Sequence, residues 1–260
     1  MAEQLVRYAT DAGFATVTLD SPKNRNAISL QLLAELRAAL AAAAADPDVR
    51  AVVLTHTGTT FSAGADLSEA GRTGTDPAEL LARSARDMAA LLREIVAHPK
   101  PIVAEVNGNV RAGGMGIVAA CDIAVAGPTS TFGLTEARLG VAIAIISLTV
   151  LHRMDARAAG RYVLTSEIFG PAEAQATGLI TMVAEHPESA VRALLAELGK
   201  QSPQGLAESK RVLARDLLDA FDRHADELCD TSARLFATDE AREGITAMFQ
   251  RRPARWVLSG

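Results

Sequence analysis

Residues 106–122, VNGNVRAGGMGIVAACD, constrain this chain more than any other stretch, because an apolar strand there leads through a glycine-rich turn into a helix. Gly113 and Gly114 place bare backbone N–H groups at a helix start, where negative charge is stabilised. Gly116, one turn further on, has no side chain. The spacing matches neither the G-x-G-x-x-G of a dinucleotide site nor a phosphate loop ending in Gly-Lys-Ser/Thr. The stretch therefore predicts an anion-binding turn of some other kind.

Strand, loop and helix patterns recur along most of the chain. The strand at 51–56, AVVLTH, is apolar throughout, as a buried parallel strand is. Ser29 is placed to cap a helix that runs to about residue 45, where Asp46-Pro47 ends it. The alternation predicts an α/β protein with parallel strands and crossover connections. The other predicted strands are 3–9 and 14–20 (joined by a tight turn at 11–13), 101–106, 122–127 and 179–184, and a long helix is predicted at 78–97 after an exposed loop at 71–77.

The composition changes after about residue 185, where no further strand pattern appears. Helical patterns cover 187–199, 203–219, 222–237 and 239–249. We divide the chain into a core of residues 1–200 and a helical region of residues 201–260. A helical tail that cannot all fold onto one sheet indicates an oligomer interface or a lid.

Composition and charge exclude several classes of protein. The net charge of −5 argues against a nucleic-acid partner. No apolar run reaches the roughly 18–20 residues of a membrane span, and the N-terminus lacks the basic-then-apolar order of a signal peptide. Cys121 and Cys229 are too few for a disulfide framework and fit a reducing compartment. We therefore expect a cytoplasmic protein that binds neither nucleic acid nor membrane.

A second segment with small residues, FSAGADL at 61–67, resembles the first in its layout. Residues 62–65 let a ligand approach the backbone closely, although an ordinary turn with Asp66 as the next helix cap explains them equally well. Each segment follows an apolar strand and presents backbone amides at a helix entrance. If the two strands are neighbours, two N–H groups converge on one oxygen. One such donor in an oxyanion hole stabilises a transition state by roughly 3–4 kcal/mol.

Glu136 is the main candidate for proton transfer. It lies in TFGLTEARLG between apolar flanks, and partial desolvation there would raise its pKa toward a useful value. In the alternative interpretation, Thr135 or Glu136 simply starts a helix. Another carboxylate, Glu105, lies on an apolar strand and should be paired, with Arg111 as the candidate partner. The five histidines show no metal-ligand spacing, so no metal site is predicted.

FSAGADL, VNGNVRAGGMG and FGLTEARLG, in this order, resemble the crotonase superfamily, also called the enoyl-CoA hydratase/isomerase family. SPKNRNAIS near the N-terminus is similar to its CoA-binding loop, and EGITAMFQRRPARW to its closing helix, so the likeness covers nearly the whole chain. It implies a spiral of ββα units with a helical C-terminal trimerisation region. It also implies homotrimers that often pair into hexamers, an acyl-CoA thioester as substrate, and no cofactor besides the coenzyme A that the substrate carries.

The resemblance assigns roles to three positions, and at a fourth position this chain lacks the residue that the family pattern requires. Ala65 and Gly113 would supply the two oxyanion-hole amides through their backbones. Glu136 matches the second of the two glutamates of typical hydratases. The first glutamate should fall at position 116, where this chain has Gly116. One carboxylate must therefore manage the proton transfers with help from water, or perform a different reaction.

Three functions remain open for a single carboxylate in this family. Glu136 could activate water for addition to C3 of a 2-enoyl-CoA, with C2 protonated from the same water or by Glu136. It could move a proton between C2 and C4, which is Δ3,Δ2-enoyl-CoA isomerisation, or the chain could bind acyl-CoA without turnover. LTEARLGVAIAIISLTVL resembles the methylglutaconyl-CoA hydratase branch of leucine degradation, although a typical version has proline where Ile143 stands. That likeness favours the hydratase.

The remaining site residues are assigned to substrate binding. Lys23 and Arg25 would meet the CoA phosphates as cations, and Arg251, from a neighbouring subunit, would reach the nucleotide. For each of these cations, a solvated surface side chain is the equal alternative. The path of the adenine and pantetheine groups would be lined by Ala27, Ala63, Ala65 and Leu67. The remaining predicted substrate-binding residues are Asp66 and Gly114.

Overall fold

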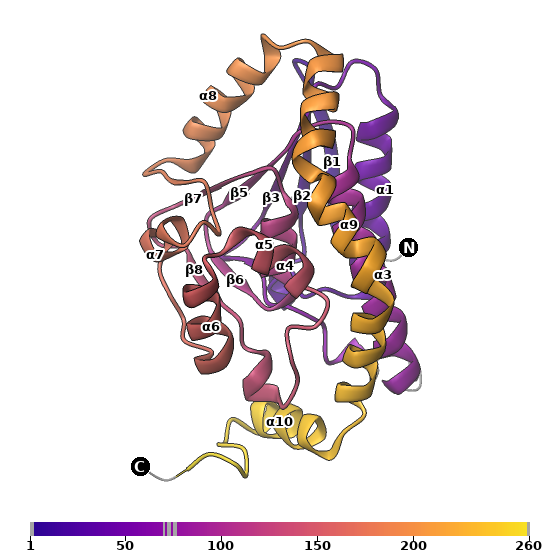
Figure 1. The fold of residues 1–260 in the computed structure, drawn as a ribbon, viewed down its shortest axis with the longest axis vertical. Coiled ribbons are helices and arrows are strands. Elements are labelled where there is room, and N and C mark those ends of the chain that lie inside the picture. The colour runs from indigo at the N-terminus through magenta and orange to yellow at the C-terminus, as the bar shows by residue number, and fades with distance from the viewer. Residues whose placement is uncertain (1–2, 70, 72–73, 75–76, 259–260) are drawn as a thin grey trace.

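The computed structural model describes residues 3–69, 71, 74 and 77–258 and is built on a six-stranded sheet (Figure 1). The strand order is β1-β2-β3-β5-β7-β9, with β1 antiparallel to β2 and every other neighbouring pair parallel. The strands of this sheet are β1 (Val6–Asp11), β2 (Phe14–Leu19), β3 (Ala51–His56), β5 (Ile102–Val106), β7 (Ile123–Ala126) and β9 (Met182–Val183). The predicted α/β class with parallel pairing is confirmed.

A second sheet of three short parallel strands lies beside the first. Its strands, β4 (Thr60–Ser62), β6 (Asn109–Arg111) and β8 (Thr131–Gly133), follow β3, β5 and β7 along the chain. Each pass of the chain thus adds one strand to each sheet, and β3-β4-α3 and β5-β6-α4 are two successive ββα units, as the resemblance implied. Three residues are too few to show a strand alternation, which is why the sequence analysis missed these strands.

Helices cover the sheets and close the core. Ser29 caps the first of them as predicted, since its Oγ accepts a hydrogen bond of 3.2 Å from the N–H of Leu32. The α-helices are α1 (Leu30–Ala45), α3 (Pro77–Ala97), α4 (Gly113–Ala120), α5 (Ser147–Arg153), α6 (Ala156–Thr165), α7 (Pro171–Ala176), α8 (Pro187–Gly199), α9 (Pro203–Phe236) and α10 (Asp239–Gln250), and the 3₁₀ helices are η1 (Pro22–Asn24) and η2 (Glu136–Leu139). No helix among these described residues is long and apolar enough to cross a membrane.

The prediction of two helices at 203–219 and 222–237 is wrong, because α9 is one helix of 34 residues. It runs along α3 down one side of the molecule (Figure 1). Ala220 and Phe221, where the break was expected, are buried and continue the apolar face that packs on the core. The first helix of the C-terminal region therefore belongs to the main core, and it ends next to α10.

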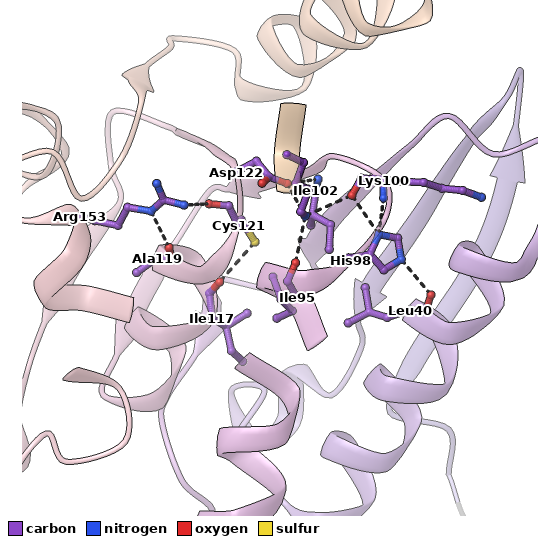
Figure 2. Close-up of polar contacts among 11 residues, drawn as sticks. Leu40, Ile95, His98, Lys100, Ile102, Ile117, Ala119, Cys121, Asp122 and Arg153 are labelled. Carbon is purple, nitrogen blue, oxygen red and sulfur yellow. Dashed lines mark hydrogen bonds and ion pairs between the residues drawn. The ribbon is translucent and has the colours of Figure 1, made fainter. Parts of the chain in front are cut away.

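The C-terminal ends of α3 and α4 meet β5 in a buried polar cluster that α9 completes (Figure 2). Lys210 of α9, 5% exposed, donates to the carbonyl oxygens of Ile95 and Lys100 at 3.0 and 3.2 Å and to Asp122 Oδ2 at 2.7 Å. The same Asp122 oxygen accepts a hydrogen bond of 2.7 Å from the N–H of Ile102. Lysine thus adds a donor to carbonyl oxygens at and just after the end of α3, where its positive charge also stabilises the negative end of the helix dipole.

The predicted pairing of Glu105 with Arg111 is wrong. Glu105 accepts a hydrogen bond of 3.2 Å from Thr55 on the neighbouring strand β3, and burial raises the pKa of its carboxyl. Arg111 instead donates to the carbonyl oxygen of Thr131 at 2.8 Å and to its hydroxyl at 2.7 Å. The reason is topological: Glu105 lies in the large sheet and Arg111 in the small one, where β8 is the neighbour of β6.

Candidate active site

A cavity of about 390 Å³ opens where the small sheet meets the helices. Its walls come from the loop after η1, the loop after β4, the start of α4, η2 with residues 141–146, and parts of α3, α9 and α10. Segments from both the predicted core and the C-terminal helical region therefore form one pocket within a single chain. Its walls are mainly apolar, with a small number of polar groups, as is usual for a ligand site.

Ala65 and Gly113, whose backbone N–H groups are the predicted pair of donors, both line this cavity. The loop of Ala65 is fixed by its neighbours, since Ile28 N–H donates to Gly64 O at 2.8 Å and Asp66 N–H to Ile28 O at 3.0 Å. Over the described part of the chain, no protein acceptor binds the N–H of either Ala65 or Gly113. A Cβ built on Gly64 would lie 3.8 Å from Gly113 N, so the two loops are in contact. β4 pairs with β6 directly, which meets the condition for convergence.

Ala112 directs the second amide by adopting a backbone conformation that L-residues rarely take. Its φ is 46° and its ψ is −118°, and the peptide plane that ψ sets is the one carrying the Gly113 N–H. Such a conformation costs about 1–3 kcal/mol and persists where the surrounding structure enforces it. Here the enforcing contacts include the hydrogen bond of 3.0 Å from Ala112 N–H to Gly133 O. Strain of this kind is common at sites that aim a group at a ligand.

Glu136 is the first residue of η2 and lines the same cavity. Burial raises the pKa of its carboxyl to about 7, an effect that the backbone N–H groups of Thr135 and Glu136 only partly offset. Its Oε2 is buried and has no hydrogen-bond partner among the residues that the structure describes. A buried carboxyl oxygen without a partner is costly, and it is available to a water molecule or to a substrate proton. A pKa near 7 suits a group that both takes and returns a proton.

Gly116 leaves no space for a second carboxylate. A Cβ built there would lie 2.6 Å from Cγ2 and 2.9 Å from Cβ of Ile146, and 3.4 Å from Cδ1 of Leu92. Ile146 itself lines the cavity. Where the resemblance leads one to expect a glutamate, the structure therefore places an isoleucine side chain from the loop before α5.

The structure brings together most of the predicted substrate-binding residues. Gly114 lies behind the cavity wall, where an added Cβ would be 2.8 Å from Ser62 Cβ, and Arg251 is an exposed residue that ends α10; neither belongs to the described lining. Lys23 is exposed and lies 3.5 Å from a Glu3 carboxylate oxygen. The predicted residues that do line the cavity are Lys23, Arg25, Ala27, Ala63, Asp66 and Leu67, beside Ala65, Gly113 and Glu136.

Sequence reasoning missed two kinds of residue at this site. Asn26 is fully buried, and its side chain binds Ser21 N at 2.7 Å, Thr57 O at 3.1 Å and Thr60 O at 2.7 Å. It holds the loop that carries Lys23 and Arg25, and only its place within SPKNRNA marks it in the sequence. The apolar wall was missed as well, because no periodicity identifies it: Met88, Val141, Ile145, Ile146, Phe236 and Phe249.

Comparisons with known proteins agree with this arrangement. A family model described as enoyl-CoA hydratase/isomerase matches residues 9–258. The chain belongs to the enoyl-CoA hydratase/isomerase family. It is therefore a member of the crotonase superfamily, whose members are enzymes. No group of three or more His, Cys, Asp or Glu within the described ranges is arranged to hold a metal ion.

Three relatives show the range of the enoyl-CoA hydratase/isomerase family around this chain. A Thermus thermophilus protein named "Putative enoyl-CoA hydratase" is 36% identical over 93% of this chain and 96% of its own length. A crystal structure of an enoyl-CoA hydratase from Mycobacterium avium is 50% identical, with a TM-score of 0.91, over 98% of this chain and 100% of that one. A peroxisomal Δ(3,5)-Δ(2,4)-dienoyl-CoA isomerase from Arabidopsis thaliana is 25% identical over 98% of this chain and 96% of its own length.

Proposed function

We propose that the protein is an enoyl-CoA hydratase that adds water across the 2,3 double bond of a short or branched 2-enoyl-CoA. One observation carries the proposal: the Glu136 carboxyl, whose Oε2 has no hydrogen-bond partner among the described residues, lines the same cavity as Ala65 and Gly113, whose backbone N–H groups have no acceptor within that part of the chain. The N–H groups of Ala65 and Gly113 suit a thioester oxygen, and the carboxyl suits the proton transfers beside it. Names of relatives such as the Thermus protein support the same reaction.

The proposed chemistry balances with one carboxylate and one water. The Glu136 carboxylate takes a proton from the water while the water oxygen bonds to C3. The C2=C3 electron pair moves onto the thioester oxygen, where the N–H groups of Ala65 and Gly113 stabilise the enolate. The protonated Glu136 then returns its proton to C2, and the net change is the addition of one water. Each oxyanion-hole donor contributes roughly 3–4 kcal/mol to the transition state, and no cofactor besides the substrate's own coenzyme A is needed.

Isomerisation is the second candidate, and the wall that faces Gly116 is the observation that favours it. Ile146 and Leu92 fill the place of a second acid, so Glu136 alone would have to hold the attacking water. In an isomerase, Glu136 takes a proton from C2 of a 3-enoyl-CoA, the same two N–H groups stabilise the dienolate, and Glu136 returns the proton to C4. The two reactions use the same groups and differ in whether water is consumed.

Mass spectrometry separates these reactions on a panel of thioesters. Purified protein is incubated with crotonyl-CoA, 3-methylglutaconyl-CoA and a 3-enoyl-CoA. We expect a product heavier by one water from a 2-enoyl-CoA and a loss of about 100-fold or more in rate for Glu136→Gln. Conversion of the 3-enoyl-CoA alone, at unchanged mass, would replace the hydratase with the isomerase. Tight binding of every thioester without turnover, insensitive to Glu136→Gln, would leave a non-catalytic acyl-CoA-binding protein.

The proposal also covers the oligomeric state of the enzyme, its cellular compartment and its pathway. We propose a homotrimer or a dimer of trimers, supported by large apolar side chains that one chain leaves exposed on α5, α6 and the segment after α6, namely Leu151, Leu164 and Ile168. Large apolar side chains that a single chain leaves exposed are candidates for burial against a second subunit. Both cysteines are free and buried, which supports action in a reducing compartment such as the cytoplasm, with leucine degradation as the candidate pathway. Light scattering on the purified protein measures the assembly.

A further inference from the structure

The η2 turn that carries Glu136 is pressed against α10 by direct contact between two backbones. A Cβ built on Gly244 of α10 would lie 2.5 Å from the carbonyl oxygen of Leu139, 2.6 Å from its carbonyl carbon and 2.7 Å from its Cα. A Cβ built on Gly140 would lie 2.8 Å from the carbonyl carbon of Glu240. Both partners are backbone atoms, which cannot turn aside as a flexible side chain does. No residue larger than glycine fits at either position without moving one element.

The face of α10 that meets η2 is built from small residues. Ala241, Gly244 and Ala247 are all buried and lie three residues apart, so they share one side of the helix. The closest approach is at Gly244, in the middle of this face. On the other side of η2, Arg138 donates a hydrogen bond of 2.7 Å to the carbonyl oxygen of Ser166, which ends α6. The turn is therefore held between α6 and α10.

No side chain of the described residues forms a hydrogen bond or an ion pair with the carboxyl of Glu136. Its Oε2 has no partner in the described part of the chain, and the hydrogen bonds that lower the pKa of the carboxyl come from the backbone N–H groups of Thr135 and Glu136. The position of the carboxyl in the cavity is consequently set by the backbone of η2. Leu139 lies three residues after Glu136 in the same single turn, so a shift at Leu139 moves the carboxyl as well. The other charged groups that line this cavity are Lys23, Arg25 and Asp66.

We propose that Gly244 is a positioning residue: the backbone contact of α10 with η2, through Gly244 and Gly140, sets where the Glu136 carboxyl stands against the substrate. This role of Gly244 rests on the proposed function only for the identity of the reaction whose rate would fall. It gives the C-terminal helix a role in proton transfer within its own chain, separate from any contact it makes with another subunit. A misplacement of about 1 Å at a reacting group can cost on the order of 100-fold in rate.

Gly244→Ala tests the contact, and Gly160→Ala is its matched control. Gly160 is also a glycine inside a helix, but an added Cβ there meets nothing within 4 Å. For Gly244→Ala we expect kcat to fall about 10-fold or more while KM stays within about threefold, because the bound thioester still finds its oxyanion hole. Gly160→Ala should leave both constants at the wild-type values. A folded Gly244→Ala enzyme with wild-type kcat, or with only a raised KM, would overturn the proposal.

A second readout does not depend on activity. Carbon-13 NMR of glutamate labelled at the carboxyl carbon follows the Glu136 titration, and Glu136→Gln identifies its signal. We expect Gly244→Ala to lower the Glu136 pKa from about 7 toward 4.5, because water enters where η2 and α10 separate. An unchanged titration would contradict the proposal. If the wild-type protein turns over no thioester, the proposed function fails, and this titration still decides whether Gly244 positions Glu136.

If Gly244→Ala does not fold, a third variant tests the same proposal. Thr238 caps α10, with its Oγ accepting a hydrogen bond of 3.2 Å from Ala241 N–H. Thr238→Ala removes this cap at a cost of about 1 kcal/mol and adds no volume. It should lower kcat and the Glu136 pKa in the same direction as Gly244→Ala, by smaller amounts. Wild-type kcat and titration in Thr238→Ala would overturn the proposal.

Discussion

Ile146 occupies the space that a side chain at Gly116 would need, with its Cγ2 2.6 Å from a Cβ built on Gly116. The first of the two glutamates that the resemblance leads one to expect therefore cannot be restored by one substitution. We expect Gly116→Glu to lower the free energy of unfolding by at least about 3 kcal/mol, from steric overlap and from burial of an unpaired charge. Urea unfolding measures the loss.

The double variant Gly116→Glu with Ile146→Ala shows how much of this stability loss comes from steric overlap with Ile146 and how much from the buried charge. Ile146→Ala alone should cost about 2–4 kcal/mol, and the double variant should be more stable than the sum of the two losses by at least about 1 kcal/mol. Additive losses would mean that Ile146 does not limit position 116. The same double variant gives a direct assay of whether a second acid raises the hydration rate.

The pH dependence of turnover follows from the raised pKa of Glu136. In the proposed hydration the carboxylate first takes up a proton, so kcat/KM should rise as the pH rises through about 7 and level off above it. Glu136→Gln should lose this limb together with the activity. A limb near 7 that persisted in the residual activity of Glu136→Gln would belong to another group.

The same carboxyl should make stability depend on pH. A carboxyl with a pKa of about 7 in the folded state and about 4.5 unfolded stabilises the fold fully below pH 4.5, and this stabilisation is lost as the pH rises through 7. We therefore expect Glu136→Gln to be more stable than the wild type at pH 8, by up to about 3 kcal/mol, and equal to it at pH 4. Thermal unfolding at the two pH values measures the difference. A Glu136→Gln protein less stable at pH 8 would show that the carboxylate has a partner.

Ala112 carries backbone strain that glycine would relieve. Glycine adopts a φ of 46° without penalty, so Ala112→Gly should raise the free energy of unfolding by about 1 kcal/mol. Ala112→Val should lower it by at least about 2 kcal/mol and also reduce kcat, because the Gly113 N–H turns away from the thioester oxygen. Urea unfolding and steady-state kinetics on both variants test this. Destabilisation by Ala112→Gly would show that the conformation is not strained.

Lys210 anchors α9, and its charge is paired in a buried site. Lys210→Met keeps most of the length of the side chain but leaves the Asp122 carboxylate without its cation, so we expect a loss of about 3–5 kcal/mol. Adding Asp122→Asn should recover at least half, because the buried charge is gone and the amide oxygen still accepts from Ile102 N–H. Chemical unfolding gives both values. A loss below about 1 kcal/mol for Lys210→Met would show that the pair is not an anchor.

The sequence pattern correctly predicted those helices and strands that carry a strong local signal, such as a capping residue, an apolar run or a glycine turn. Ser29 marked the start of α1, the apolar run 51–56 became β3, and Gly113 opened α4. Where the local signal was weak, prediction failed: the three-residue strands were missed, and α9 was divided at residues 220–221, whose burial depends on α3 and the core behind it. Glu105 and Arg111 were paired because they are close in sequence, whereas two different sheets separate them.

The sequence by itself determined the family, the candidate amides at Ala65 and Gly113, and the single candidate acid, Glu136, since each is a matter of residue type and order. Only the tertiary structure decided that β4 lies beside β6, so that the two loops touch. It also decided that Ile146 excludes a side chain at position 116, and that α10 lies against the turn of Glu136. The physical reason is that a closest approach between segments distant in the chain depends on packing, and interior packing leaves no spare volume for even one carbon atom.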